Sequence, residues 1–226
     1  MNAMKKIAAA VCASLVLSAP AIAKDHVFIV MDVANTSYAM KNPEQNRMLN
    51  KFALSKIMEE IDEEEVSIIL TSDPYSMIFS GNEDQFKGKQ VKAVYDSLSN
   101  KERLCSDLGL TYAKINNAIS KLKDGDTAKV IAVSPHINVP FPCKSEQKIS
   151  IPQDIDDNSP LKEIANNEQV KSILHLRLEP DQDIPLSKFY REAGKDLLKN
   201  KVEFVEVNST MAKLQDDNYR LLGGNQ

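Results

Sequence analysis

Two kinds of spacing between apolar residues occur along this chain, and they predict its secondary structure. Short, almost continuous apolar runs, typical of strands buried on both faces, occur at 27–31, 66–70 and 129–133. Apolar residues every three or four positions, typical of helices with one buried face, occur at 47–61, 86–98, 108–122 and 186–199. Ser106 or Asp107 can cap the helix over 108–122.

Shorter elements complete the predicted order. A second strand at 76–79 is joined to 66–70 by a turn, and a short helix near 161–167 opens at Pro160. In 172–178 leucines alternate with His175 and Arg177, which predicts a half-exposed strand. A strand at 202–207 and a helix capped by Ser209 end the domain.

Strands that alternate with helices predict the fold class. We expect an α/β fold of three layers, doubly wound, with a mostly parallel central sheet and helices on both faces. One such domain accounts for 24–222, with a disordered tail at 223–226.

The first 23 residues have the pattern of a secretory signal peptide. Lys5 and Lys6 precede an apolar stretch, 7–17, that is too short to span a bilayer, and Ala21-Ile22-Ala23 resembles a cleavage site. We therefore expect a chain that is exported, to the periplasm or outside the cell, and that starts near Lys24 once processed.

Composition excludes several classes of partner. The chain has 28 basic and 32 acidic residues, so nucleic acid and anionic lipid are not expected partners. With only 7 glycines it has no glycine-rich phosphate loop, and no cofactor is expected. After processing two cysteines remain, Cys105 and Cys143, and export favours a disulfide over two free buried thiols.

Asp32 is the main candidate site residue. The apolar run 27–31 ends at this aspartate, and small or polar residues follow it. The carboxyl end of a buried strand is where α/β sheets present side chains to ligands. The irregular stretch 134–159 is rich in proline, and loops of this length in a domain are usually functional or mobile.

With Asp32, Ser106 and Ser134 in place, the chain resembles the von Willebrand factor type A family. FIVMDVANTS lies where that family has an Asp-x-Ser-x-Ser motif after its first strand. VSIILTSDPYSMIFSG is similar to the paired strands that follow its first helix. CSDLGLTYAKINNAISKL, followed by KVIAVSPH, resembles its threonine loop and helix and then the strand that ends in Thr-Asp-Gly.

The resemblance implies a degenerate form of the family's metal-ion-dependent adhesion site. Asp32 matches the first aspartate, and Thr36 and Ser106 can replace two hydroxyl ligands. Ala34 and Pro135 stand where a hydroxyl and a carboxylate are needed. Since a hard divalent ion needs a charged oxygen cage, the resemblance implies at most weak Mg²⁺ binding. Otherwise Asp32 caps a turn or the start of a helix.

The resemblance also places the loops 32–37, 105–107 and 134–159 at one end of the sheet, where a Cys105–Cys143 bond would pin the proline-rich loop. The residues expected to face a partner are Asn35, Ser37, Asp107, His136, Asn138 and Phe141. The implied function is a non-enzymatic, protein-binding module of the cell envelope, serving a secretion, conjugation or pilus system.

Two enzymatic alternatives remain open. Asp32–Thr36 also resembles the first motif of haloacid-dehalogenase phosphatases, with Asp32 as nucleophile and Thr71 or Ser72 in the second motif, but Ala34 removes the general acid. Asp32, Asn35 and Asp73 resemble part of a metal-dependent nuclease site of the NYN/PIN type, which needs more carboxylates.

Two further expectations concern aromatic and imidazole side chains. The three histidines, which are far apart in sequence, are not expected to form a metal set. The apolar residues around 75–79, Tyr75 among them, are expected to pack in the core rather than form an interaction patch.

Overall fold

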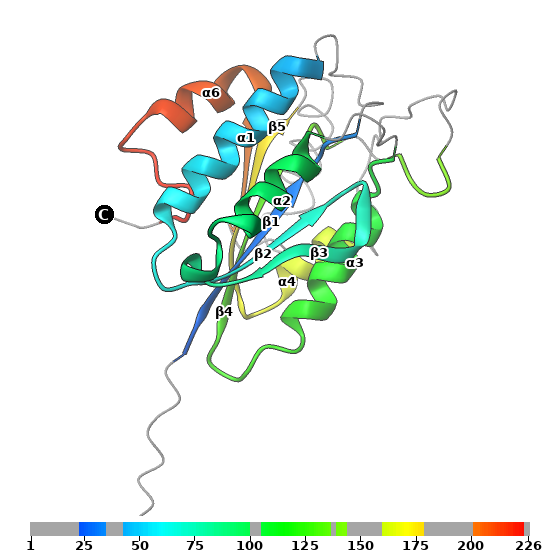
Figure 1. Cartoon of the computed structure of the whole chain (residues 1–226). Coiled ribbons are helices and arrows are strands. Elements are labelled where there is room, and N and C mark those ends of the chain that lie inside the picture. Colours follow the sequence, from blue (N-terminus) through cyan, green and yellow to red (C-terminus); the bar gives the residue numbers. More distant parts are fainter. Residues whose placement is uncertain are drawn as a thin grey trace, which may run out of the picture.

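A six-stranded sheet forms the middle of three layers in the computed structural model, which describes residues 23–34, 43–99, 105–136, 139–143, 160–178 and 201–223 (Figure 1). The strand order is β3-β2-β1-β4-β5-β6, and every neighbouring pair is parallel except β2–β3. The strands are β1 (Asp25–Met31), β2 (Glu65–Leu70), β3 (Asp73–Gly81), β4 (Thr127–Val133), β5 (Val170–Leu178) and β6 (Val202–Glu206). The predicted α/β fold with a mostly parallel sheet is confirmed.

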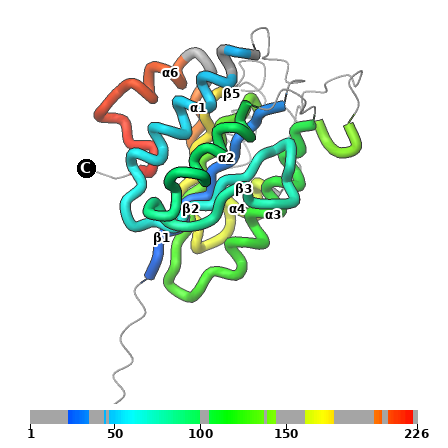
Figure 2. Tube along the Cα trace, viewed as in Figure 1, coloured from blue at the N-terminus to red at the C-terminus, as the bar shows by residue number. Residues whose placement is uncertain are grey.

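Helices cover both faces of the sheet, as predicted (Figures 1 and 2). One face carries α1 (Pro43–Glu60), α2 (Lys89–Leu98) and α6 (Val207–Gln215). The other carries α3 (Leu108–Ile119) and α4 (Pro160–Asn166), which contact each other. A 3₁₀ turn, η1 (Glu83–Gln85), precedes α2.

The apolar run of β1 shows why these strands lack polar alternation. Val27 and Ile29 pack with α1, whereas Phe28 and Val30 pack with α3, and all four are almost fully buried. Because both faces of a parallel sheet are covered, both sets of side chains must be apolar. The carboxyl ends of β1, β2, β4 and β5 lie at one end of the sheet, called the loop end below.

The prediction that β5 is half-exposed is wrong. His175 is 0% exposed and Arg177 is 1% exposed. The register between β5 and β6 shifts between His175 and Leu178, and Arg177 has a left-handed backbone with φ of 66°. The simple alternation of faces therefore breaks at the end of the strand, and a charged side chain turns inward there.

Helix starts are only partly as predicted. Asp107 is the N-cap of α3, where its carboxylate accepts a bond of 2.9 Å from the N–H of Leu110. Ser209 lies inside α6 and does not cap it, because this helix begins at Val207, directly after β6. The helix predicted at 186–199 and the tail 224–226 lie outside the described residues, as do residues 1–22 of the signal-like segment. In the part of the chain that is described, none of the helices has the length and apolar character needed to cross a membrane.

Candidate functional site

A buried polar cluster lies where β1 ends. We call Asp32, Thr71, Ser106 and Ser134 the Asp32 cluster. One carboxylate oxygen of Asp32 accepts bonds from the hydroxyls of Ser106 (2.9 Å) and Ser134 (3.2 Å), and the other accepts the N–H of Ala34 (3.0 Å). The hydroxyls of Ser106 and Thr71 are 3.1 Å apart. Parallel strands end side by side, so residues 32, 71 and 134 meet although they are distant in sequence.

Asn50 and Arg177 support this cluster from the α1 side. The backbone carbonyl of Asp32 accepts bonds from the Asn50 amide (2.8 Å) and the Arg177 guanidinium (3.4 Å). Arg177 also donates to the side-chain oxygen of Asn50 (2.8 Å), and its backbone N–H donates to the Thr210 hydroxyl (2.8 Å). A buried arginine thus joins β1, α1, β5 and α6. The sequence interpretation missed both Asn50 and Arg177, although each is a polar residue in an apolar pattern.

Segment 139–143 is tied to the cluster by its backbone and by a disulfide. Ser106 and Val139 exchange two backbone hydrogen bonds, of 3.1 and 2.7 Å. Cys105 and Cys143 form a disulfide, with their Cα atoms 5.6 Å apart. The predicted pair therefore lies at disulfide distance, and the bond closes a loop across which 38 positions separate the two cysteines.

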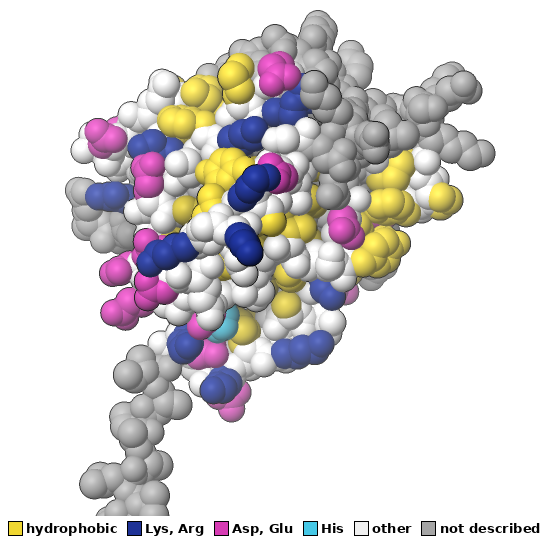
Figure 3. All heavy atoms as spheres, viewed as in Figure 1, with side chains coloured by type: hydrophobic (Ala, Val, Ile, Leu, Met, Phe, Trp, Pro, Cys, Tyr) yellow, Lys and Arg dark blue, Asp and Glu magenta, His cyan; other side chains and the backbone are white. Residues whose placement is uncertain are grey.

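The Asp107 carboxylate positions an apolar surface beside this segment. One of its oxygens accepts the N–H of Phe141 (3.1 Å), and the other caps α3 at Leu110. Phe141 is 37% exposed, Leu110 is 40% exposed, and the ring of Tyr75 lies 5.9 Å from the ring of Phe141. We call Tyr75, Leu110 and Phe141 the Tyr75 surface. Hydrophobic side chains gather on the right of Figure 3, where Figure 1 places segment 139–143 and the nearby ends of α3 and β3.

A bulge of three unpaired residues in β3 presents Tyr75 to solvent. Along β3, Asp73 is opposite Leu70 and Met77 is opposite Ile69, so residues 74–76 have no partner on β2. Bulges of this kind re-aim side chains at the ends of sheets. Tyr75 is 64% exposed. The expectation that Tyr75 packs in the core is therefore wrong.

The residues expected to face a partner have different environments. Asn35, Ser37 and Asn138 lie outside the described residues. Asp107 and His136 are buried, at 5% and 8% exposed, so they support the surface instead of forming it. The reason is that Asp107 caps a helix and His136 turns inward at a left-handed residue with φ of 59°. Of the described residues in that set, only Phe141 is exposed.

Comparison with known proteins supports the fold alone. No protein-family model matches the sequence, and no curated protein sequence matches it either. Two crystal structures of the pilus adhesin SpaC from Lactobacillus rhamnosus GG are similar, with TM-scores of 0.53 and 0.54 at 13% and 10% identity. In both, 85% of this chain is covered, but the chain spans only 29–30% of the adhesin's length.

Two proteins from Bacteroides have a more distant likeness. They are an aerotolerance-related membrane protein of Bacteroides fragilis (TM-score 0.47, 12% identity) and BatB of Bacteroides thetaiotaomicron (TM-score 0.46, 13% identity). The match covers 84% of this chain in both cases, and 94% and 95% of those chains. These two TM-scores are too low to support an argument. The likeness to the adhesin is consistent with a von Willebrand factor type A-like fold.

The described residues do not form a cage for a hard divalent cation. Mg²⁺ and Ca²⁺ need several oxygen ligands with compensating negative charge. Both carboxylate oxygens of Asp32 already accept bonds within the cluster, and Ala34 and Pro135 carry no side-chain oxygen. No group of three or more acidic, histidine or cysteine residues suited to a metal occurs in the described ranges. Thr36, the remaining ligand expected from the resemblance, lies outside them.

Weak or absent metal binding is therefore the expected result. Titration calorimetry of the processed chain with Mg²⁺, Mn²⁺ and Ca²⁺ should show no sub-micromolar affinity, because an ion would have to displace bonds that Asp32 already accepts. Tight binding that Asp32→Asn abolishes would contradict this and restore a metal-dependent adhesion site.

Two buried histidines meet near the cluster. The rings of His136 and His175 are 5.0 Å apart, and His175 stacks on Phe204 at 4.7 Å. Among the described residues, neither Nε2 atom has a hydrogen-bond partner. Burial lowers the pKa of His136 from 6.5 to about 4, and burial together with the charge of His136 lowers the pKa of His175 well below its usual value.

Acid should destabilise the protein through His136. The unfolded chain protonates this imidazole near pH 6.5, but the folded chain does so only near pH 4. The stabilisation is therefore complete above pH 6.5 and is lost as the pH falls to about 4, by about 3 kcal/mol. We expect His136→Asn, which tolerates the left-handed backbone, to have a smaller loss between pH 7 and pH 4 in urea melts. An equal loss in both proteins would contradict this origin.

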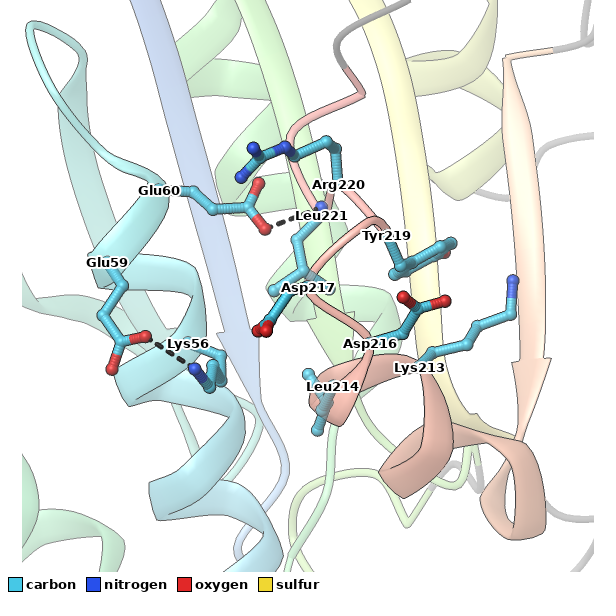
Figure 4. A pocket seen from close by; sticks show the side chains of 10 residues that line it. All are labelled: Lys56, Glu59, Glu60, Lys213, Leu214, Asp216, Asp217, Tyr219, Arg220 and Leu221. Carbon is cyan, nitrogen blue, oxygen red and sulfur yellow. Dashed lines mark hydrogen bonds and ion pairs between the residues drawn. The ribbon is translucent and has the colours of Figure 1, made fainter.

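A pocket of about 310 Å³ lies at the other end of α1 (Figure 4). There Glu60 accepts the backbone N–H groups of Leu221 and Leu222, at 3.1 Å each, and so holds the segment after α6 against α1. Glu60 follows Asn50 by about 15 Å along the helix. This pocket is therefore separate from the Asp32 cluster, and Glu60 in it fastens the end of the chain.

Proposed function

We propose that this chain is an exported module that binds another protein of the cell envelope, and that it does not act as an enzyme. The observation that carries the proposal is the Tyr75 surface. It exposes two aromatic rings and a leucine at the loop end, and segment 139–143 is held there by a disulfide and by Asp107. Exposed aromatic side chains in a rigid setting are the usual anchors of protein interfaces.

Rigidity matters because ordering a loop on binding costs free energy. Segment 139–143 is fixed before any partner arrives, so less of the interaction energy is spent on ordering it. Tyrosine and phenylalanine bury a large area for few rotatable bonds. A partner that covers Tyr75 and Phe141 would therefore gain affinity from a small surface.

The Asp32 cluster supports a structural role over a catalytic one. A nucleophile or general base must reach its substrate. Asp32 is 0% exposed, and both its carboxylate oxygens accept hydrogen bonds within the fold. We propose that it holds the starts of three loops together beneath the Tyr75 surface.

The envelope location rests on two features of the chain. The first 23 residues have the pattern of a signal peptide, and the Cys105–Cys143 bond suits an oxidising compartment. The likeness to a pilus adhesin is one of fold. By analogy we propose that the chain is a component or accessory of an envelope assembly such as a secretion, conjugation or pilus system.

Capture from a detergent extract of the cell envelope tests the proposed surface. The processed chain and its Tyr75→Ser, Phe141→Ser double variant would serve as baits, and Met48→Ser would be the matched control. Met48 is 59% exposed on α1, in the helix layer that covers the opposite face of the sheet from α3. We expect the double variant, unlike the other two baits, to capture at least tenfold less of a specific partner protein. Equal capture by all three baits would refute the proposed surface.

Processing is expected at or near Lys24. N-terminal sequencing and intact mass of the protein from the envelope fraction should show a chain that lacks the first 23 residues, because Ala21-Ile22-Ala23 precedes that point. A full-length product recovered from the cytoplasm would contradict export.

A further inference from the structure

The outer edge of β3 is a second feature that can receive a partner, and over Met77–Gly81 it runs away from the loop end, since Gly81 pairs with Val66 near the start of β2. β3 is the last strand of the sheet, and over Met77–Gly81 it pairs with β2 on one side (Figure 1). In the described part of the chain, no backbone hydrogen bond joins 74–81 to any element except β2. Since alternate N–H and C=O groups of a strand point to opposite sides, half of those in this stretch face outward.

This edge has only part of the protection that edge strands usually have. Lysines, prolines, inward-pointing charges and bulges commonly prevent an edge from pairing with another strand. Here no residue from Pro74 to Asn82 is charged. Pro74 and the bulge at 74–76 interrupt the first part of the strand, and a second register shift leaves Ile78 without a partner on β2. Beyond these interruptions, Phe79–Gly81 pairs regularly with β2, and its outer side is open to pairing.

A groove beside this edge has the chemistry of a peptide-binding site. It measures about 460 Å³ and is lined by Met77, Ile78, Phe79, Ser80, Gln85 and Gln90. Met77 and Ile78 are half-buried, whereas the two glutamines are exposed. A backbone edge, apolar side chains and amide groups together match an extended peptide, which offers main-chain hydrogen bonds and alternating side chains.

We propose that the β3 edge over Met77–Gly81 binds an extended apolar segment of the partner protein, with basic residues at its ends, as an added strand. The nearest charged residues on either side of the uncharged stretch are Asp73 and Glu83, both acidic. Basic ends on the partner segment complement them. The bulge that presents Tyr75 directly precedes this edge, so one partner can occupy both surfaces.

Charge disfavours a second copy of this chain as the occupant. Antiparallel pairing of two β3 edges would bring Asp73 of one copy towards Glu83 of the other at both ends of the added strand. Both copies also carry a net charge of −4. The nearby Lys87 does not offset this, because it pairs with Asp84 of its own chain at 2.7 Å.

The test uses synthetic peptides with the processed full chain. The probe is a fluorescein-labelled peptide of alternating valine and threonine with two lysines at each end. One control has glutamates in place of the lysines, and the other has N-methyl groups on the amides of one edge. We expect anisotropy titrations to show at least tenfold weaker binding for both controls, since one removes the charge match and the other the main-chain hydrogen bonds. Hydrogen exchange should show new protection of 77–81 with the lysine-ended peptide.

The choice of a protein as the occupant of this edge rests on the proposed function. The outcomes of the peptide test nevertheless distinguish a failure of the edge inference from a failure of that function. No binding by the lysine-ended peptide, equal binding of the N-methylated peptide, or protection elsewhere would overturn the strand-addition mode. Sedimentation showing a dimer whose residues 77–81 are already protected would instead assign the edge to a second copy. If the peptide fails while capture still depends on Tyr75 and Phe141, only the edge inference fails.

Discussion

The Cys105→Ser, Cys143→Ser double variant is expected to fold with the same sheet but to lose about 2–4 kcal/mol of its free energy of unfolding. The disulfide closes the loop that ends in segment 139–143, and the core of the sheet lies elsewhere. The backbone amides of Ser106 and Val139 each donate a hydrogen bond to the other residue's carbonyl. Hydrogen exchange of these two amides should become faster than that of the amides in β1. Urea melts and hydrogen exchange would measure both effects.

Partner binding by this variant should fall by more than its global stability predicts. A freed segment must be ordered on binding, and Phe141 then loses its fixed position beside Tyr75. Wild type treated with reductant is the matched control and should behave like the variant. Unchanged exchange at Ser106 and Val139, or unchanged capture, would show that the disulfide does not organise this surface.

Replacing Arg177 by methionine is expected to cost about 3 kcal/mol or more of the free energy of unfolding. Arg177 is 1% exposed, and its guanidinium donates to Asn50 and to the carbonyl of Asp32. Its loss leaves two buried acceptors, the Asn50 amide oxygen and the Asp32 carbonyl, without a charged donor. Chemical denaturation at pH 7 would measure the change.

Lys171→Met is the matched control, because Lys171 is an exposed cation on the same strand. Substitutions at such positions usually change stability by no more than about 0.5 kcal/mol. If Arg177→Met were as stable as Lys171→Met, the buried arginine would not hold the loop end together, and the role given to Asn50 would also need revision.

The sheet could be predicted from sequence because its strands have a clear physical signature. β1 and β4 are buried on both faces over most of their length and are almost continuously apolar there, so their runs stand out. The helix over 108–119 was equally clear, since its buried residues recur at helical spacing and Asp107 caps it. Parallel order then follows from strands alternating with helices.

The candidate site was harder to predict, because sequence does not distinguish a buried polar residue from an exposed one. Arg177 alternates with leucines as an exposed residue would, yet a left-handed turn of the backbone directs it to Asn50. Tyr75 lies in an apolar stretch that suggested core, yet a bulge exposes it. Both outcomes depend on local irregularities of the strands, for which a regular alternation pattern has no signal.

The most direct measurement of the central claim is photo-crosslinking in intact cells from a benzophenone amino acid placed at position 75. We expect a crosslink from this position to one envelope protein, and none to that protein from position 48 on α1. The crosslink should weaken when Cys105 and Cys143 are replaced, because the neighbouring Phe141 is then no longer held in place. No crosslink from position 75, or the same crosslinks from positions 75 and 48, would contradict the claim that the Tyr75 surface binds a partner protein.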